Sequence, residues 1–443
     1  MTTRRAVLMA AGATGALGAL AACSPSAPSA GKSSGSASNR KAVTFRLWDD
    51  TAKPAYEESF KAFTAQTGYP VEIQLVPWES YWTKLPLDIA SGDAADVFWM
   101  NSANYVQFQQ SGNLMNVSTE VGNGEGAWEK SVVDLYTRDG GLWGVPQLWD
   151  SIAVFYNKKL TEAAGVDPSA LTFVPGDGSG DTLIEAARKL TVDDAGKHPG
   201  EDGFAKDRRA VYGFNAQADR QAVIGCFLAS NGGTWQEHDK YVFDSPEGVG
   251  AFQYLSDLIN KYVVAPSAAD TNQNGNLTRD LFIQGKLGLF QSGPYNLKNI
   301  YEGVQQSFPW AIAPLVAGPA GGLSVVHGVV AAGNAKTKNK EGATKLLSWL
   351  GSAEGQRPIA THGVAFPAHR DVQKDFVDFW KAKNVDVNQF IAAAKHSVQA
   401  DTGAKANAGL TAAMPTFQEI LMGRIPAADG LKKAQADGNA AMG

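Results

Sequence analysis

Cysteine is scarce in this sequence, with only Cys23 and Cys226 among 443 residues. Cys226 lies in an apolar stretch, where a small buried side chain is the expected role. An intrachain disulfide is not expected, because Cys23 has the setting of a lipidated residue. The six histidines show no metal-ligand spacing with one another or with cysteine. We therefore expect neither a metal ion nor another cofactor.

Long apolar runs, surplus positive charge and catalytic motifs are also missing. After residue 22 no continuous apolar run reaches the roughly 20 residues of a membrane span, so no membrane helix is expected in the mature chain. The net charge of -5 argues against nucleic acid as a partner, because phosphate binding needs a basic surface. No G-x-S-x-G, H-E-x-x-H or P-loop motif occurs, and no catalytic residue is assigned.

The N-terminal segment has the layout of a bacterial lipoprotein leader. Two arginines precede an apolar run over 6–22, which ends in small residues before Cys23. This pattern predicts a signal peptide and lipobox over 1–23, with lipid attached to Cys23. Twin-arginine export and general secretion both remain open. The small polar residues of 24–40 predict a disordered tether, so the rest of the chain is expected to fold outside the cell membrane, anchored to it by lipid.

The chain that follows the tether has the pattern of an α/β protein. About 400 residues are too many for one core, so two domains are expected. Strand-like segments over 43–48, 71–75 and 96–99 alternate with helical spacing over 56–63 and 82–89. This order predicts a parallel sheet covered by helices, with ligands bound beyond the carboxyl ends of its strands.

Further elements follow along the chain. Residues 147–150 are expected to connect two strands. The expected strands are 142–146, 151–156, 288–290, 310–313 and 325–332, and the expected helices are 181–190, 220–230, 246–262, 343–350 and most of the chain from 371 onward.

Tryptophans stand beside acids or amides near the expected strand ends. An indole can cover the C–H face of a sugar ring, while carboxylates and amides pair with its hydroxyls. The pattern indicates carbohydrate binding, although core packing explains any single tryptophan. Two carboxylates such as Asp49 and Asp50 would also suit a glycosidase. The pairs are Trp48 with Asp49 and Asp50, Trp78 with Glu79, Trp99 with Asn101, and Trp149 with Asp150.

Several segments, taken in order, resemble the family 1 extracellular solute-binding proteins, the maltose-binding-like receptors of ABC sugar importers. The similarity extends over about 41–424 and includes the run from Ala90 to Val97, with Ala95 where the family usually has proline. The most specific segments are Gly144-Val145-Pro146 followed by Phe155-Tyr156-Asn157-Lys158, and Phe282-Ile283-Gln284-Gly285-Lys286 followed by Gly293-Pro294-Tyr295.

The resemblance implies an α/β fold of the type II periplasmic-binding-protein kind, with a ligand cleft between two lobes. It places the N-terminal lobe at 42–150 plus 328–366 and the C-terminal lobe at 151–327 plus 367–443. It implies a monomeric, non-enzymatic component of an ABC transporter that captures a sugar or oligosaccharide by hinge closure and delivers it to the permease subunits. The alternatives are another solute, such as a glycerol phosphoester, or a lipid-anchored glycosidase.

The resemblance and the residue pattern together give a set of expected ligand contacts. Aromatic faces are expected from the N-terminal lobe or the hinge and, opposite them, from the C-terminal lobe. We expect Trp149→Ala or Tyr295→Ala to weaken binding about tenfold or more with the fold intact. The expected ligand-binding residues are Trp78, Trp99, Trp149, Trp235 and Tyr295 as aromatic faces, Asp49, Asp50, Asn101 and Asp150 as hydroxyl partners, and His327 and Arg370, which could instead support the hinge.

Overall fold

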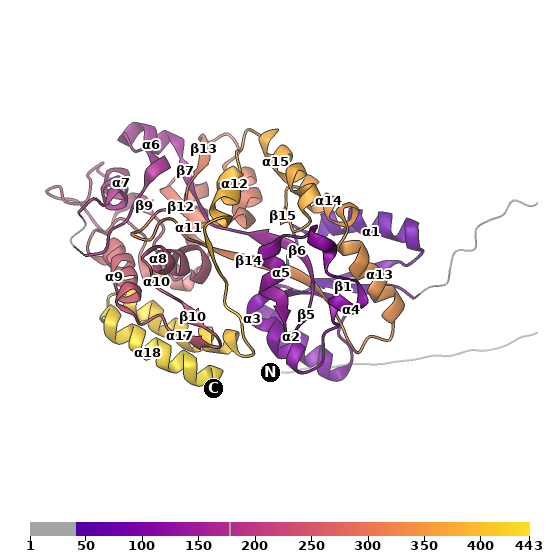
Figure 1. Ribbon diagram of the computed structural model, residues 1–443. Coiled ribbons are helices and arrows are strands. Elements are labelled where there is room, and N and C mark those ends of the chain that lie inside the picture. Colours follow the sequence, from indigo (N-terminus) through magenta and orange to yellow (C-terminus); the bar gives the residue numbers. More distant parts are fainter. Residues whose placement is uncertain (1–40, 177–178) are drawn as a thin grey trace, which may run out of the picture. The chain divides into compact units, whose positions relative to one another are not determined.

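The computed structural model describes residues 41–176 and 179–443, shown in Figure 1. The expected signal peptide, the tether and Cys23 lie outside these residues. Within the described part, two main β-sheets are surrounded by helices. No helix in this part combines the length and hydrophobicity needed to cross a lipid bilayer.

The first sheet has the strand order β15-β6-β14-β3-β1-β2, and β16 pairs with β14. Strand β1 is parallel to both β2 and β3, which confirms the parallel pairing predicted from the strand and helix order. Strand β14 is antiparallel to β3 and β6. The strands are β1 (Val43–Leu47), β2 (Val71–Leu75), β3 (Val97–Asn101), β6 (Val145–Asp150), β14 (Ser324–Gly333), β15 (Phe366–Pro367) and β16 (Ser397–Gln399).

The carboxyl ends of β1, β2 and β3 meet at one edge of this sheet. Leu47 pairs with Leu75 at the ends of β1 and β2, and Asn101 is the last residue of β3. Trp48 directly follows β1, and Trp78 is the first residue of helix α2 after β2. Chain segments that are far apart in the sequence thus bring their polar and aromatic residues to the same edge.

One expectation from the sequence is wrong at the end of β6. Residues 147–150 were expected to connect two strands, but they lie within β6 itself. The segment is paired on both sides, with His327 of β14 opposite Asp150 and with Phe366 of β15 opposite Trp149. Both partners come from much later in the chain, so the local pattern could not reveal them.

The second sheet has the order β13-β7-β12-β9-β8, with β12 parallel to β9 and antiparallel to β7. Strand β12 ends at Ser292, so the Gly293-Pro294-Tyr295 motif that follows lies at the carboxyl end of this strand. The strands are β7 (Ala153–Asn157), β8 (Val192–Asp193), β9 (Arg209–Phe214), β12 (Leu287–Ser292) and β13 (Trp310–Ala313); two small hairpins are formed by β4 (Thr137–Arg138) with β5 (Gly141–Leu142) and by β10 (Gln236–Glu237) with β11 (Lys240–Tyr241).

Two helices in the first half of the chain show clear local signals at their ends. Helix α1 has proline in its first turn and ends at Gly68, which has a left-handed φ of 74°. The Asp181 carboxylate caps α7 by accepting a hydrogen bond from the Ile184 backbone N–H. The helices of this half are α1 (Lys53–Thr67), α2 (Trp78–Ser91), α3 (Ser102–Gln110), α4 (Val117–Glu120), α5 (Lys130–Tyr136), α6 (Lys158–Ala164) and α7 (Thr182–Leu190), with the 3-10 turns η1 (Gly124–Gly126) and η2 (Pro168–Ala170).

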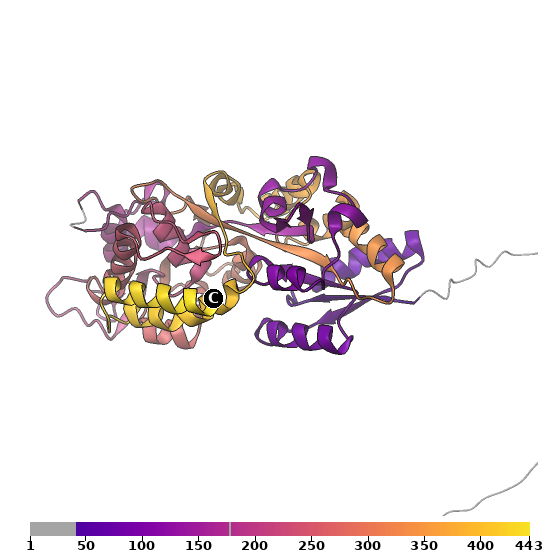
Figure 2. The ribbon, with the colours of Figure 1, turned by 60° about the horizontal axis from the view of Figure 1, so that its bottom comes forward.

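The remaining helices fill the second half of the chain. The π-helical segment η3 leads directly into α8, and α17 and α18 lie side by side, as Figure 2 shows in yellow. They are η3 (Arg220–Gly225), α8 (Cys226–Ser230), α9 (Pro246–Asn260), α10 (Ala268–Gln273), α11 (Leu277–Ile283), η4 (Pro294–Asn296), α12 (Leu297–Val304), α13 (Lys340–Leu350), α14 (Ala353–Thr361), η5 (Arg370–Val372), α15 (Gln373–Lys381), α16 (Asn388–Ala394), α17 (Ala406–Leu421) and α18 (Ala427–Met442).

The apolar core continues from one sheet to the other. A large cluster of buried side chains spans the first sheet and reaches Phe155 of β7 in the second sheet. The link runs through Phe390, whose ring centroid lies 5.8 Å from that of Phe155 and 6.4 Å from that of Phe366. A second cluster fills the space between the second sheet and its helices and contains the free, buried Cys226. The two main sheets therefore share part of one core.

Candidate ligand-binding site

A cavity of about 410 Å³ lies between residues that follow the two sheets. Trp48, Asp49 and Trp78 line it from the carboxyl ends of β1 and β2, and Tyr295 lines it from the end of β12. Its volume is in the range of small-molecule sites. The remaining lining residues are mostly polar: Gln217, Asp219, Gly275, Asn276, Arg279, Phe290, Ser292, Asn296 and Asn299.

Aromatic side chains form a layered wall on the first-sheet side. The Trp48 ring centroid lies 5.3 Å from that of Trp78, 5.5 Å from that of Trp82 and 4.8 Å from that of Trp99. Trp99 is 1% exposed, whereas Trp78 is 47% exposed. Trp99 therefore supports the wall from within, and Trp78 offers an open face. Tyr295 offers a second open face from the other side, with 41% of its surface exposed.

The Asp49 carboxylate is held in place at the rim of the cavity by its own turn. Its Oδ1 accepts hydrogen bonds from the Thr51 backbone N–H at 2.8 Å and from the Thr51 hydroxyl at 2.7 Å. This local turn leaves its other oxygen to face a ligand. Asp50, the next residue, is exposed and is not among the lining residues.

Asp150 and His327 face each other at the ends of β6 and β14. Gln221 donates a hydrogen bond from Nε2 to Asp150 Oδ1. Burial raises the pKa of Asp150 to about 7; hydrogen bonds from Gln221 and the His327 backbone oppose this rise, and the Asp219 carboxylate adds to it. Burial, with the Arg220 guanidinium nearby, lowers the pKa of His327 to about 4. Near neutral pH the imidazole is thus uncharged.

Two carboxylates influence the Tyr295 phenol electrostatically. Desolvation of its hydroxyl group, and after it the Asp219 and Asp150 carboxylates, raise the pKa of Tyr295. Both carboxylates therefore lie within electrostatic range of the hydroxyl group at the same place in the fold. Asp150 belongs to the first sheet and Asp219 precedes η3, so a molecule near Tyr295 would meet groups from both sides.

Asp219 also sets the orientation of the segment that follows it. Its Oδ1 accepts hydrogen bonds from the backbone N–H groups of Gln221 at 3.0 Å and Ala222 at 2.7 Å. This cap begins the π-helical segment η3, and such segments often occur at functional sites. The sequence analysis missed Asp219 and Gln221 as site residues. Its only signal was an acid directly before the expected helix 220–230, which indicates a cap rather than a ligand contact.

Three of the expected ligand residues are buried. Trp99 donates from Nε1 to the Tyr56 hydroxyl at 3.1 Å, and Asn101 accepts from Asn104 at 2.8 Å. Trp149 is 3% exposed and stacks on Phe366 at 4.7 Å. Because Trp149 is buried, Trp149→Ala is expected to cost about 3–5 kcal/mol of stability, so a loss of binding in this variant would not by itself indicate a ligand contact. Ligand contacts by all three residues stay a prediction.

Trp235 and Arg370 are placed away from the lining residues of this cavity. Trp235 is 7% exposed and lines a different cavity. Arg370 is about half exposed, and its Nε lies 4.0 Å from Glu129 Oε2. The cavity thus brings together Asp49, Trp78 and Tyr295, with Asp150 and His327 close by.

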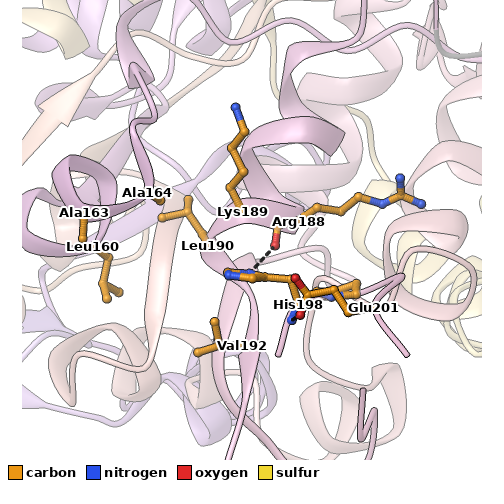
Figure 3. Close-up of a pocket in the computed structure, with 10 residues that line it drawn as sticks. Leu160, Ala163, Ala164, Arg188, Lys189, Leu190, Val192, His198 and Glu201 are labelled. Atoms are coloured by element: carbon orange, nitrogen blue, oxygen red, sulfur yellow. Dashed lines mark hydrogen bonds between the residues drawn. The ribbon is translucent and has the colours of Figure 1, made fainter. Parts of the chain in front are cut away.

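Another hollow, of about 680 Å³, lies between α6, α7 and the chain after β8 (Figure 3). Its apolar wall includes Leu160 and Ala164, and His198 Nδ1 lies 3.3 Å from the Arg188 carbonyl oxygen and 2.9 Å from that of Thr191. Tryptophan and tyrosine are missing from its described lining residues. Since its histidine is already engaged with backbone groups, this hollow is a weaker candidate than the cavity beside Tyr295.

Among residues 41–176 and 179–443, no three or more histidine, cysteine, aspartate or glutamate side chains come together in a way that could hold a metal ion. The residues that line the cavity offer carboxylates, amides and hydroxyls for hydrogen bonding and aromatic rings for stacking.

Comparison with known proteins agrees with this geometry. The crystal structure of M. tuberculosis UspC is 42% identical, with a TM-score of 0.76, over 90% of this chain and 100% of that chain. The ABC substrate-binding protein Lmo0181 from Listeria monocytogenes, solved with cycloalternan, is 22% identical, with a TM-score of 0.77, over 90% of this chain and 98% of that chain. The maltodextrin-binding protein MdxE of Bacillus subtilis is 23% identical over 271 residues, which are 61% of this chain and 60% of that protein.

These similarities confirm the predicted two-lobed α/β fold of periplasmic solute-binding proteins. The model of one protein family, bacterial extracellular solute-binding protein, matches residues 48–357. The chain therefore belongs to the bacterial extracellular solute-binding protein family, as the resemblance in its sequence predicted.

Proposed function

We propose that this protein captures a sugar or oligosaccharide outside the cytoplasmic membrane and delivers it to the permease subunits of an ABC transporter. One observation carries the proposal: two open aromatic faces, Trp78 and Tyr295, line one cavity together with Asp49 and Asp219. Relatives support the class of ligand, since Lmo0181 was solved with cycloalternan, T. maritima MalE3 with maltose, and MdxE is a maltodextrin-binding protein.

The chemistry of the lining suits a neutral polyol. Aromatic faces cover the C–H groups of a sugar ring, and oxygen and nitrogen atoms from acids and amides pair with its hydroxyls. A hydroxyl left unpaired in such a site costs about 1–3 kcal/mol, so polar groups must surround the ring. Asn276, Asn296 and Asn299 add amide groups to the carboxylates.

A phosphoester ligand is disfavoured by the charges in the cavity. The one arginine among its described lining residues, Arg279, lies 3.0 Å from the Asp280 carboxylate, which offsets its charge. Asp49 and Asp219 face the same space and would repel a phosphate. The alternative of a glycerol phosphoester therefore has less support than a sugar.

Capture by closure follows from the origin of the lining residues. Because both sheets contribute, a ligand makes all of its contacts only when the two sides come together, and it favours that closed form. A micromolar affinity corresponds to about -8 kcal/mol, which a few stacked rings and a paired hydroxyl network can supply. No turnover is involved in this proposal. Lipid attachment at Cys23 and a monomeric state are part of it and rest on the sequence alone.

A carbohydrate screen tests the proposal directly. The purified protein is heated with a panel of mono- to tetrasaccharides, and hits are measured by titration calorimetry. A ligand at 100 times its Kd stabilises the folded state by about 2.7 kcal/mol, so a clear rise in Tm is expected, with the sugar recovered unchanged. Shorter sugars released during incubation would support the glycosidase alternative, and no rise with any sugar would contradict the proposal.

The aromatic faces provide a sharper test with the sugar found in the screen. We expect Trp78→Ala and Tyr295→Ala each to weaken binding about tenfold or more, because stacked aromatic rings contribute on the order of 1–3 kcal/mol in comparable base-stacking sites. The Tm of the free protein should change little, since both rings are about half exposed. Leu87→Ala is the matched control, because Leu87 is an apolar residue on α2 that is 69% exposed. Full affinity in both test variants would mean that the ligand binds elsewhere.

A further inference from the structure

Gln217 is the buried amide among the residues that line the candidate cavity. It lies in the segment between β9 and η3, and only 7% of it is exposed. The other described lining residues with an amide side chain, Asn276, Asn296 and Asn299, are more exposed. A buried amide that is locked by its surroundings presents its donor and acceptor atoms to a ligand in one fixed arrangement.

The chain on both sides of Gln217 is anchored by hydrogen bonds. Asn215 Nδ2 donates to the Gln291 carbonyl oxygen at 3.0 Å, and Asn215 Oδ1 accepts from the Gln291 backbone N–H at 2.7 Å. On the other side the Asp219 carboxylate caps η3, and the Asp219 backbone N–H donates to the Gln217 carbonyl oxygen at 2.8 Å. Because β9 and β12 are parallel neighbours, these anchors hold Gln217 at the same sheet edge as Tyr295.

The orientation of the Gln217 amide is set by Thr278 of α11. The fully buried Thr278 hydroxyl donates to Gln217 Oε1 at 2.7 Å, so the amide nitrogen is left for another partner. Gln217 Nε2 has no acceptor among residues 41–176 and 179–443. It is also not one of the fully enclosed unpaired atoms of this part of the chain, so a molecule in the cavity can reach it.

A fixed donor at this point differs from the acceptors elsewhere in the lining. The Asp49 carboxylate only accepts hydrogen bonds when it is ionised. Asn296 uses its amide nitrogen on the Ser292 hydroxyl at 2.9 Å, which leaves its Oδ1 as an acceptor. A sugar hydroxyl has one proton to donate and two lone pairs that accept. A ring oxygen beside Gln217 must therefore accept, whereas a hydroxyl beside Asp49 must donate.

We propose that Gln217 is a specificity-determining residue, which donates a hydrogen bond from Nε2 to one oxygen of the bound sugar, and that Thr278 is the positioning residue that fixes this donor. A sugar without an acceptor at that position leaves the donor unpaired in a closed site. Unpaired groups of this kind give binding sites their strongest discrimination between similar ligands. This inference rests on the proposed function, because it assumes that the cavity binds a sugar.

Deoxy and deoxyfluoro sugars distinguish a donor in the site from an acceptor. The probes are these derivatives, position by position, of the sugar that binds most tightly in the carbohydrate screen above. Carbon-bound fluorine accepts a hydrogen bond weakly and cannot donate one, whereas hydrogen does neither. At one position we expect the deoxy derivative to bind about tenfold more weakly than the parent sugar, and the fluoro derivative to recover about threefold of that loss. Titration calorimetry on the full chain measures each affinity.

Two variants assign that position to the Gln217 amide. Gln217→Leu removes the donor, and Thr278→Val removes the hydroxyl that fixes it, so each should erase the difference between the fluoro and deoxy derivatives at this position alone. Thr271→Val is the matched control, because Thr271 is buried on α10, donates to the Ala268 carbonyl oxygen at 3.3 Å and does not line the cavity. Thermal unfolding without sugar checks that each variant folds, and Gln217→Leu keeps the experiment decisive if Thr278→Val does not.

The outcomes separate this inference from the proposed function. If no position favours fluorine over hydrogen, or if Gln217→Leu keeps the native pattern, the role of Gln217 is overturned, while binding of the parent sugar still supports the proposed function. A native pattern in folded Thr278→Val would overturn the positioning role of Thr278. If no sugar of the screen binds, the proposed function is contradicted and this inference is rejected with it.

Discussion

At the scale of single residues, Asp150 and His327 illustrate how one environment shifts two pKa values in opposite directions. The two residues face each other on neighbouring strands, and burial disfavours the charged form of each. The carboxyl pKa rises to about 7 and the imidazole pKa falls to about 4. Both side chains are therefore less charged in the folded protein than in the unfolded chain over the range between these values.

Their contributions to the pH dependence of stability oppose each other. Between about pH 4 and pH 7 the folded protein holds a proton on Asp150 that the unfolded chain releases, so this contribution to stability is lost as the pH rises. Between about pH 4 and pH 6.5 the unfolded chain holds a proton on His327 that the folded protein does not, so stability is gained as the pH rises. In the native protein the two slopes largely cancel.

We expect single substitutions to reveal each slope. Relative to the native protein, Asp150→Asn should gain stability as the pH rises from 4 to 7, and His327→Gln should lose stability as the pH rises from 4 to 6.5, each by up to about 3 kcal/mol. Urea unfolding at a series of pH values measures both changes. Parallel pH profiles for the native protein and the two variants would show that these residues do not titrate as described.

At the scale of elements, the π-helical segment η3 begins between two cavities, one lined by Asp219 and the other by Arg220. Asp219 caps its start, Gln221 reaches Asp150, and Arg220 reaches Asp401. The segment thus links the end of β6 with the chain after β16 through two side chains that are adjacent in sequence. A change in its first turn should therefore affect both the contact with Asp150 and the contact with Asp401.

We expect the cap of η3 to be measurable through a matched pair of variants. Asp219→Ala removes the acceptor for two backbone N–H groups and should lower the free energy of unfolding by about 0.5–2 kcal/mol. Asp219→Asn keeps an oxygen acceptor and should retain most of the stability. Urea unfolding of both variants tests this, and equal losses in the two would show that the charge of Asp219, rather than its cap, supports the segment.

At the scale of the whole described chain, the shared core predicts cooperative unfolding. Phe390 connects Phe155 of the second sheet with Phe366 of the first sheet, and all three side chains are fully buried. The Ser151 hydroxyl also donates to the Phe390 carbonyl oxygen at 2.6 Å. These contacts tie the two sheets together where the chain crosses between β6 and β7.

We expect calorimetric unfolding in a single transition, with equal calorimetric and van't Hoff enthalpies. Phe390→Ala should cost about 3–5 kcal/mol and weaken the link between the sheets, so that the calorimetric enthalpy exceeds the van't Hoff value. Phe376→Ala is a useful control, because Phe376 is equally buried but packs on Phe366 and Trp380. Two separate transitions in the native protein would contradict the coupling.

Parts of the candidate site could be predicted from the sequence because they follow regular strands. Asp49 and Trp78 come directly after β1 and β2, and Tyr295 follows a specific motif after β12, so their place at strand ends was visible. Gln221 and Asp401 gave no such signal, because their contacts are with residues 71 and 181 positions away along the chain. Trp149 was expected at the surface of the site, but pairing of β6 with β14 and β15 buries it.

The sequence alone determined the class of the fold, the alternation of strands and helices over 43–99 and the family, because alternation, helical spacing and local motifs are properties of neighbouring residues. Only the tertiary structure decided which tryptophans keep an open face and which carboxylates meet. Those outcomes depend on strand pairing and packing between distant segments, and the same residue type can be buried at Trp99 and half exposed at Trp78.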